Sequence, residues 1–64
     1  MNGPELRRIR RVMRLTQQEL AAELGIGRSS VQHYEYGDRP VPRVVELAVR
    51  HLHTKRRMSN ESLE

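Results

Sequence analysis

The side chains best suited to chemistry in this 64-residue sequence are polar groups gathered in one short stretch. They are a guanidinium, a hydroxyl, an amide, an imidazole and a phenol, from Arg28, Ser29, Gln32, His33 and Tyr36. On a helix these groups lie on one exposed side and its flanks, where a generic solvated helix carries glutamates and lysines. An arginine fork donates two hydrogen bonds to a guanine edge or binds a phosphate. The stretch is therefore predicted to be a helix that enters the major groove of DNA.

Residues that catalyse reactions or bind metals elsewhere are poorly placed in this sequence. His51 and His53 are two residues apart and would point to different sides of a helix, and the remaining histidine, His33, is remote in sequence. The sequence has no Cys, so a thiol nucleophile, a disulfide and a thiolate metal site are excluded. It also has no phosphate-binding loop and no GxSxG motif. We therefore expect no enzymatic activity, no metal and no cofactor.

Two short helices joined by a glycine turn are predicted to position the polar stretch. Thr16 can cap the first helix while Glu19 reaches back to the Thr16 backbone N–H, which makes a capping box. Good helix formers fill residues 17–24, and Gly25 follows where a left-handed residue ends a helix. Gly27 is the expected N-cap of the second helix, which a later glycine ends. Two stops so close together imply a steeply packed pair of helices, as in a helix-turn-helix unit.

At these positions the sequence resembles the helix-turn-helix domains of the lambdoid phage repressor and Cro type, the XRE-like family. The resemblance rests on matched residues within the motif, namely Gln17, Ala21, Gly25, Ile26, Val31 and Tyr34. It extends outward over residues 5–45, through Leu6, Arg10, Leu15 and the run Glu35, Tyr36 and Gly37. The sequence departs from the family at Gly27, where serine or threonine is usual, and in joining the fourth and fifth helices into one. The resemblance implies an all-α bundle of four helices, or five, like the lambda repressor domain.

The resemblance and the polar stretch together define a predicted surface for double-stranded DNA. Its residues are Gln17, Gly27, Arg28, Ser29, Gln32, His33, Tyr36, Arg39 and Arg43. Arg28 is expected to read a guanine, with a phosphate contact as the competing role. By resemblance, Gln17 would hold the DNA backbone, and Arg39 and Arg43 would flank a loop that contacts phosphates. The competing roles are a polar helix start for Gln17, a surface histidine for His33 and a plain turn for Gly27.

The first helix is predicted to begin at Gly3-Pro4-Glu5 and to run to about Arg14, after a frayed Met1 and Asn2. Its core stripe is Leu6, Ile9 and Met13. Arg10 falls inside this stripe, where an unpaired charge would cost several kcal/mol. The resemblance pairs Arg10 with Glu35, so these two residues are assigned a structural role together with Ala21 and Gly25.

The last helix is predicted to start after Pro42 and to run from Arg43 to about His53. Its inward residues are expected to be Val44, Val45, Ala48 and Leu52, with Val49 at the margin. Leu47 lies on another side, which is either simply exposed or a dimer contact. Residues 1–53 would then form the DNA-binding domain, and residues 54–64 a mobile basic and polar tail.

Composition sets the outer limits of function. Lys and Arg number 12 against 8 Asp and Glu, which gives a net charge of +4, and eleven of the twelve cations are arginine. The sequence lacks an apolar run of about eighteen residues and the apolar middle of a signal peptide. No membrane association is therefore expected, and a soluble cytoplasmic protein is the expected class.

Two other binding functions compete with this prediction. The first is an antitoxin or protein-interaction module that keeps the helix-turn-helix fold and binds a toxin or another protein through the Leu47 side or the tail. The second is RNA binding, which is disfavoured because Tyr34 and Tyr36 are the only aromatic residues and Tyr34 should be buried. The sequence favours a DNA-binding transcriptional regulator, a repressor, with a homodimer on half-sites about 34 Å apart as one open arrangement.

Overall fold

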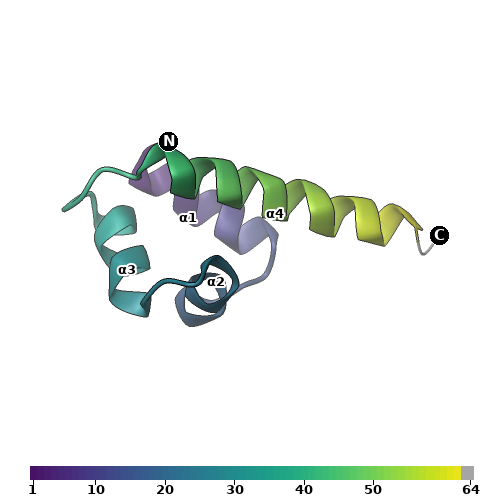
Figure 1. The fold of residues 1–64 in the computed structure, drawn as a ribbon, viewed down its shortest axis with the longest axis horizontal. Coiled ribbons are helices and arrows are strands. Elements are labelled where there is room, and N and C mark those ends of the chain that lie inside the picture. Colours follow the sequence, from purple (N-terminus) through teal and green to yellow (C-terminus); the bar gives the residue numbers. More distant parts are fainter. Residues whose placement is uncertain (63–64) are drawn as a thin grey trace.

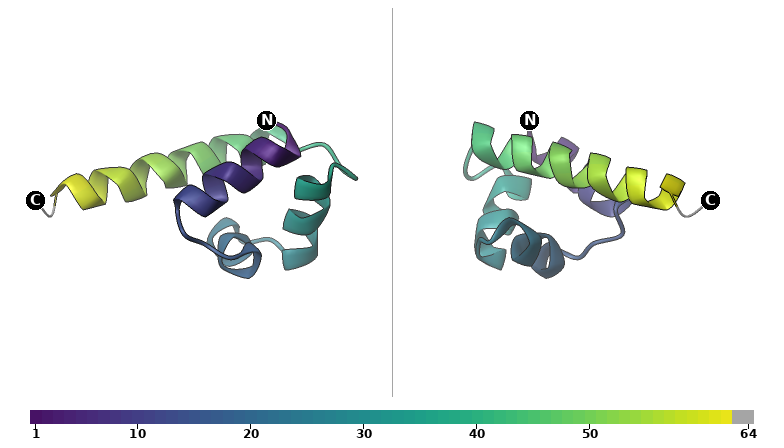
Figure 2. Two further views of the ribbon diagram at one scale, coloured as in Figure 1. Left: turned by 180° about the vertical axis from the view of Figure 1, so that it is seen from behind. Right: turned by 45° about the vertical axis from the view of Figure 1, so that its right-hand side comes forward.

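Four helices make up the fold in the computed structural model, which describes the backbone of residues 1–62 and the side chains of residues 1–57. They are α1 (Gly3–Val12), α2 (Gln17–Leu24), α3 (Arg28–Tyr36) and α4 (Arg43–Ser62). α1 and α4 lie side by side and run in the same general direction, while α2 and α3 form the other side of the bundle (Figure 1). Seen from behind, α1 lies in front of α4 (Figure 2). The predicted all-α bundle of four helices is confirmed.

The local signals around α2 and α3 act as the sequence predicts. The Thr16 N–H donates to Glu19 Oε1 at 2.8 Å, and the Glu19 N–H donates to Thr16 Oγ1 at 3.0 Å, which completes the capping box. Gly25 ends α2 with φ at 71°, in the left-handed region that favours glycine. Gly37 ends α3 with φ at 87°. Because both ends are set locally, the two helices have fixed lengths before they pack.

The core is built from apolar residues of all four helices. Leu6, Leu20, Val31 and Val49 are fully buried, one from each helix. Val44 is 77% exposed, so the prediction that it faces inward and Val49 lies at the margin is wrong. Adjacent residues on a helix differ by about 100° in direction, and α4 contacts the core along Val45, Val49 and Leu52. Val44 therefore lies to the side of that stripe.

The start of the chain is ordered by contacts that the sequence analysis did not predict. Asn2 is the N-cap of α1, and its side chain accepts a hydrogen bond from the Glu5 N–H at 2.8 Å. The Met1 amino group donates to Glu46 Oε1 at 3.1 Å, which joins the chain start to α4. The expected fraying of Met1 and Asn2 is therefore wrong.

α1 ends at Val12, two residues before the predicted end, and an arginine follows in the left-handed conformation. Arg14 has φ at 60°, and its N–H donates to the Arg11 carbonyl at 2.9 Å. The Leu15 N–H donates to the Arg10 carbonyl at 3.2 Å, so the two bonds form a Schellman motif. A non-glycine residue in this conformation costs roughly 1–2 kcal/mol.

α4 is longer than the sequence analysis predicts. It continues to Ser62, so the predicted helix end near His53 is wrong. No glycine or proline interrupts the chain between Arg43 and Ser62, and Lys55, Arg56 and Arg57 are good helix formers. The predicted boundary between residues 53 and 54 thus falls inside one helix. The mobility predicted for residues 54–64 stays a prediction, and residues 63–64 lie outside the described part of the chain.

Length alone does not make α4 a membrane helix. Within the described residues, no helix combines the length and the apolar character that crossing a bilayer requires.

Candidate nucleic-acid interface

A buried carboxylate, Glu35 of α3, holds the first three helices together. Glu35 is 4% exposed, and Arg10 of α1 donates to both of its oxygens, from Nε at 2.7 Å and from Nη2 at 3.1 Å. Gln17 of α2 donates from Nε2 to Glu35 Oε1 at 3.1 Å. Arg7 adds a longer contact of 3.4 Å from its Nε. The predicted pair of Arg10 and Glu35 is present, and it fixes the orientation of α3 relative to α1 and α2.

The surroundings of Glu35 keep its carboxylate ionised. Burial alone raises the pKa of Glu35, but the hydrogen bonds from Arg10 and Gln17, the positive charge of Arg10 and the Arg7 contact outweigh it. The pKa therefore lies below the ordinary value for glutamate. Arg10 is satisfied in turn, because its Nη1 also donates to the Leu15 carbonyl at 2.9 Å.

The predicted polar residues do share the outward side of α3. Arg28, Ser29 and Tyr36 are exposed, and Gln32 and His33 are partly exposed, whereas Val31 and Glu35 are buried. With its amide oxygen turned toward Arg28, Gln32 accepts from Arg28 Nε and Nη2, both at 3.3 Å. This contact between residues one helical turn apart orients the guanidinium on the surface. α3 thus presents an ordered donor group at its first turn.

The end of α3 carries a second contact, which involves a residue that the sequence analysis did not assign. His33 Nδ1 lies 3.0 Å from Asp38 Oδ2, so this histidine is held against the loop that follows the helix. The N–H groups of Gly37 and Asp38 both donate to the His33 carbonyl at 3.1 Å, which brings Asp38 back toward the helix. The signal for this contact in the sequence is an acidic residue directly after the helix-ending glycine.

Arg39 and Arg43 lie beyond the same end of α3. Both are exposed, Arg39 in the loop and Arg43 as the first residue of α4. Among the described residues, neither side chain has a hydrogen bond or an ion pair, although the Arg39 backbone N–H donates to the His33 carbonyl at 3.4 Å. Cationic groups therefore stand at both ends of α3, with Arg28 at its start. A helix of nine residues is about 13 Å long, so this spacing suits phosphates on either side of a groove.

The surroundings of Gln17 and Gly27 differ from those that the sequence suggests. Gln17 is half-buried because one amide N–H bonds to Glu35, which leaves its second side-chain N–H and its backbone N–H at the start of α2. Gly27 is the N-cap of α3, with φ at −77°. A Cβ at Gly27 would meet only the Ser29 hydroxyl, at 3.8 Å. The fold itself therefore does not require glycine at this position.

The two remaining structural assignments agree with the geometry. Ala21 is 3% exposed, and its carbonyl accepts the N–H of Ile26 at 3.0 Å across the turn. Gly25 supplies the left-handed residue of that turn. Arg7, the third donor to Glu35, was not predicted, although it precedes Arg10 by one turn on the same side of α1.

Comparison with curated proteins and with solved structures gave no match. A family model described as a helix-turn-helix domain matches residues 3–61, a range that includes α1, α2, α3 and nearly all of α4. The match covers the capping box, the turn at Gly25 and the polar side of α3 described above. By this match and by its fold, the chain belongs to the helix-turn-helix domain family.

Proposed function

We propose that this protein binds double-stranded DNA sequence-specifically through α3 and regulates transcription as a repressor, like the lambdoid phage repressor and Cro proteins it resembles. Membership of the helix-turn-helix family supports DNA as the partner. The observation that carries the proposal is that α3 has one buried side and one exposed polar side. Its inner residues are buried and bonded to α1 and α2, while its outer side holds a row of hydrogen-bonding groups.

The arrangement supports a docking mode with base readers in the centre and phosphate contacts around them. Arg28 and Ser29 at the first turn of α3 would meet base edges, as residues near the start of a recognition helix do. The backbone N–H groups at the start of α2 would hold a phosphate. Arg39 and Arg43 would hold phosphates beyond the other end of α3. Because Glu35 fixes α3 on two neighbouring helices, the side chains meet the duplex without a large ordering cost.

The proposal is tested by titration against random duplexes at several salt concentrations, followed by selection of bound sequences. If Arg28 reads a guanine, Arg28→Ala costs about 1–3 kcal/mol at the selected site and relaxes preference at one base pair. If Arg28 binds a phosphate, the variant weakens all sequences alike and lowers the salt slope by about 1. Arg50→Ala is the matched control. It removes the same charge from α4, where Arg50 pairs with Glu46 and does not belong to the α3 surface. Selection that yields no preferred sequence would overturn the proposal.

A homodimer is the second part of the proposal. Val44 and Leu47 are exposed on one side of α4, at 77% and 51%, and a twofold contact there would cover them. A dimer would place two α3 helices on half-sites about 34 Å apart on one face of the duplex. Sedimentation with and without the selected duplex measures the stoichiometry. A single chain bound to a site without twofold symmetry would contradict the dimer and leave DNA binding intact.

A further inference from the structure

Several cations of this protein lie outside the α3 surface, on α1, after α1 and on α4. Among the described residues, five cationic side chains have no hydrogen bond or ion pair; two are on α1, one follows the C-cap of α1, and two are on the C-terminal half of α4. We call them the basic face, and they are Arg8, Arg11, Arg14, Lys55 and Arg56. In contrast, Arg7, Arg10 and Arg50 are all paired with glutamates. The basic face thus concentrates uncompensated positive charge.

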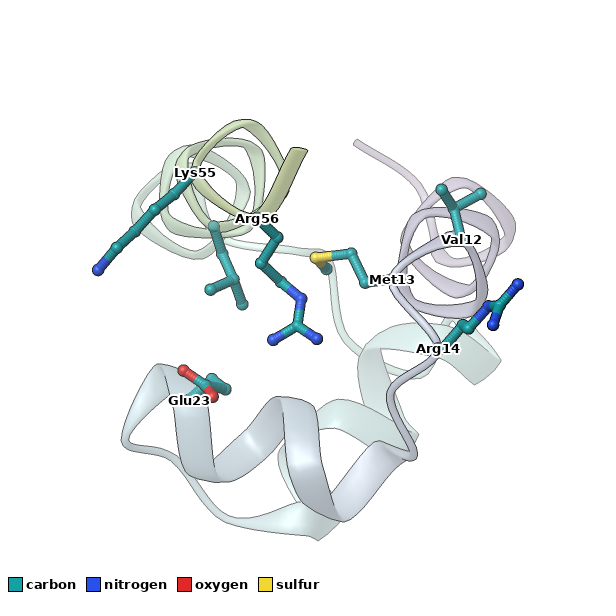
Figure 3. Close-up of a pocket in the computed structure, with 7 residues that line it drawn as sticks. Val12, Met13, Arg14, Glu23, Lys55 and Arg56 are labelled. Carbon is teal, nitrogen blue, oxygen red and sulfur yellow. The ribbon is translucent and has the colours of Figure 1, made fainter. Parts of the chain in front are cut away.

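Three residues of the basic face, Arg14, Lys55 and Arg56, lie at one end of the bundle. Figure 3 shows a cleft between α1, α2 and α4 at this end, with Met13 and Arg56 pointing into it and Glu23 across from them on α2. Arg14 and Lys55 point outward on either side. Among the residues whose side chains are described, Glu23 is the only acid that lines the cleft. Arg8 and Arg11 continue the face along α1, where they line a shallow hollow with Val12.

Distance separates the α4 residues of the basic face from the α3 surface. Arg43, the α4 residue nearest to α3 in the chain, and Arg56 are thirteen positions apart on one continuous helix, which corresponds to about 20 Å. This is more than twice the Debye length of about 8 Å at physiological salt. α4 extends from the α3 end of the molecule toward the opposite end (Figure 1). Lys55 and Arg56 are therefore electrostatically screened from Arg43.

The conformation of Arg14 is an independent observation that points to the same end of the molecule. The Schellman motif after α1 needs a left-handed residue, for which glycine carries no penalty. Arginine at φ of 60° costs roughly 1–2 kcal/mol there. Backbone strain of this kind persists at functional sites, where the side chain has a use. At this position the chain has a charged arginine, although glycine would adopt the left-handed conformation without this energetic penalty.

We propose that the basic face binds the phosphates of a second DNA duplex, so that one molecule bridges two duplex segments. The inference rests on the proposed function for the first duplex, which occupies α3. Arg8 and Arg11, one turn apart on α1, suit successive phosphates of one strand. Arg14 stands beyond the end of α1, and Lys55 and Arg56 stand across the cleft on α4. A duplex offers the regular anionic lattice that unpaired arginines recognise through bidentate hydrogen bonds. An acidic protein segment anchored on exposed Val12 is the competing occupant, which the test distinguishes.

The test measures whether the protein holds a free duplex on a duplex that is attached to beads. A duplex of random sequence on beads is mixed with the protein and with a fluorescent copy of the same duplex, and the retained fluorescence is measured. Two double variants with equal charge are compared, Arg8→Gln/Arg11→Gln and Arg28→Gln/Arg43→Gln. Each removes two charges from the net +4 and leaves +2. Circular dichroism melting confirms that both variants are folded.

The proposal predicts that the first variant binds single duplexes as the wild type does, with its α3 sequence preference intact, but retains about tenfold less of the second duplex. The second variant loses that preference. If the first variant bridges as well as the wild type, the basic face is not a DNA site, and any bridging comes from a dimer that uses two α3 helices. If polyglutamate binds the wild type and not the first variant, and no second duplex is retained, the face recognises acidic protein and the proposal is wrong. Failure of the α3 function would instead appear as unchanged sequence preference in the second variant.

Discussion

Gly3 of α1 and Glu35 of α3 meet backbone to backbone, because a Cβ built on Gly3 would lie 2.5 Å from the Glu35 carbonyl oxygen. The Tyr34 carbonyl would be 2.6 Å away. The start of one helix thus rests directly on the last turn of another, in an order that places the positive end of the α1 dipole against the negative end of α3.

Gly3→Ala should therefore destabilise the protein. The new methyl group meets backbone atoms that cannot rotate away, so α1 and α3 must separate, at a cost of about 1–3 kcal/mol. In a domain of this size each kcal/mol lowers the melting temperature by about 4–8 °C. Thermal melting followed by circular dichroism measures the change. Arg8→Ala on the same helix is the control, and equal melting of the two variants would show that the close approach is unimportant.

Glu35→Ala should destabilise more strongly. It leaves the Arg10 guanidinium, whose side chain is 12% exposed, without its carboxylate, and breaking a buried pair costs about 3–5 kcal/mol. Replacing both partners, as in Arg10→Met/Glu35→Leu, should restore much of the loss because no buried charge is left unpaired; Arg7 also loses Glu35, but its side chain is 39% exposed. Urea unfolding of the three proteins provides the comparison. Lost DNA binding with unchanged melting in Glu35→Ala would mean that the pair acts in recognition.

The same carboxylate should make stability depend on acid. The folded pKa of Glu35 is lowered, so its contribution is complete above the unfolded value of about 4.5 and is lost as the pH falls through the folded pKa. Glu46 adds to the trend, because its hydrogen bond from the Met1 amino group, together with Arg50, also lowers its pKa. Melting temperature should be flat near neutral pH and fall in this acid range. In Glu35→Gln the fall should be smaller, and an identical acid profile would contradict the assignment.

Gly27→Ser tests the two roles that the sequence leaves open for this N-cap. The position has an ordinary φ of −77° and space for a side chain, so serine should cap α3 and add a few tenths of a kcal/mol. If Gly27 is a plain turn residue, DNA affinity stays unchanged. If its bare backbone approaches a phosphate, affinity falls while the melting temperature rises. Gly25→Ser, at a φ of 71°, should lower stability and serves as the contrast.

The features that the sequence predicted correctly depend on residues close together in the chain. The capping box at Thr16, the left-handed Gly25 and the outward row on α3 follow from spacing alone. The pair of Arg10 and Glu35 came from the family resemblance, since spacing says nothing of contacts between helices.

What the sequence did not predict depends on how elements meet in space. Val44 and Val49 exchange the positions expected for them because the angle at which α4 approaches the core decides which valines are buried. The contact of His33 with Asp38 depends on the backbone path after Gly37, and that of Gln17 with Glu35 on the packing of α2 against α3. The length of α4 was underestimated because apolar periodicity fades once the helix passes the core, although helix-forming residues continue.

Arg14→Gly separates stability from function at the end of α1. Glycine removes the left-handed penalty of roughly 1–2 kcal/mol but adds freedom to the unfolded chain, so a net gain of about 0.5–1 kcal/mol is expected. If the Arg14 guanidinium belongs to a phosphate-binding surface, the same variant should retain less of the second duplex in the bead assay while melting at a higher temperature. Its sequence preference through α3 should not change. A more stable variant that bridges as well as the wild type would show that the strain at Arg14 serves no DNA contact.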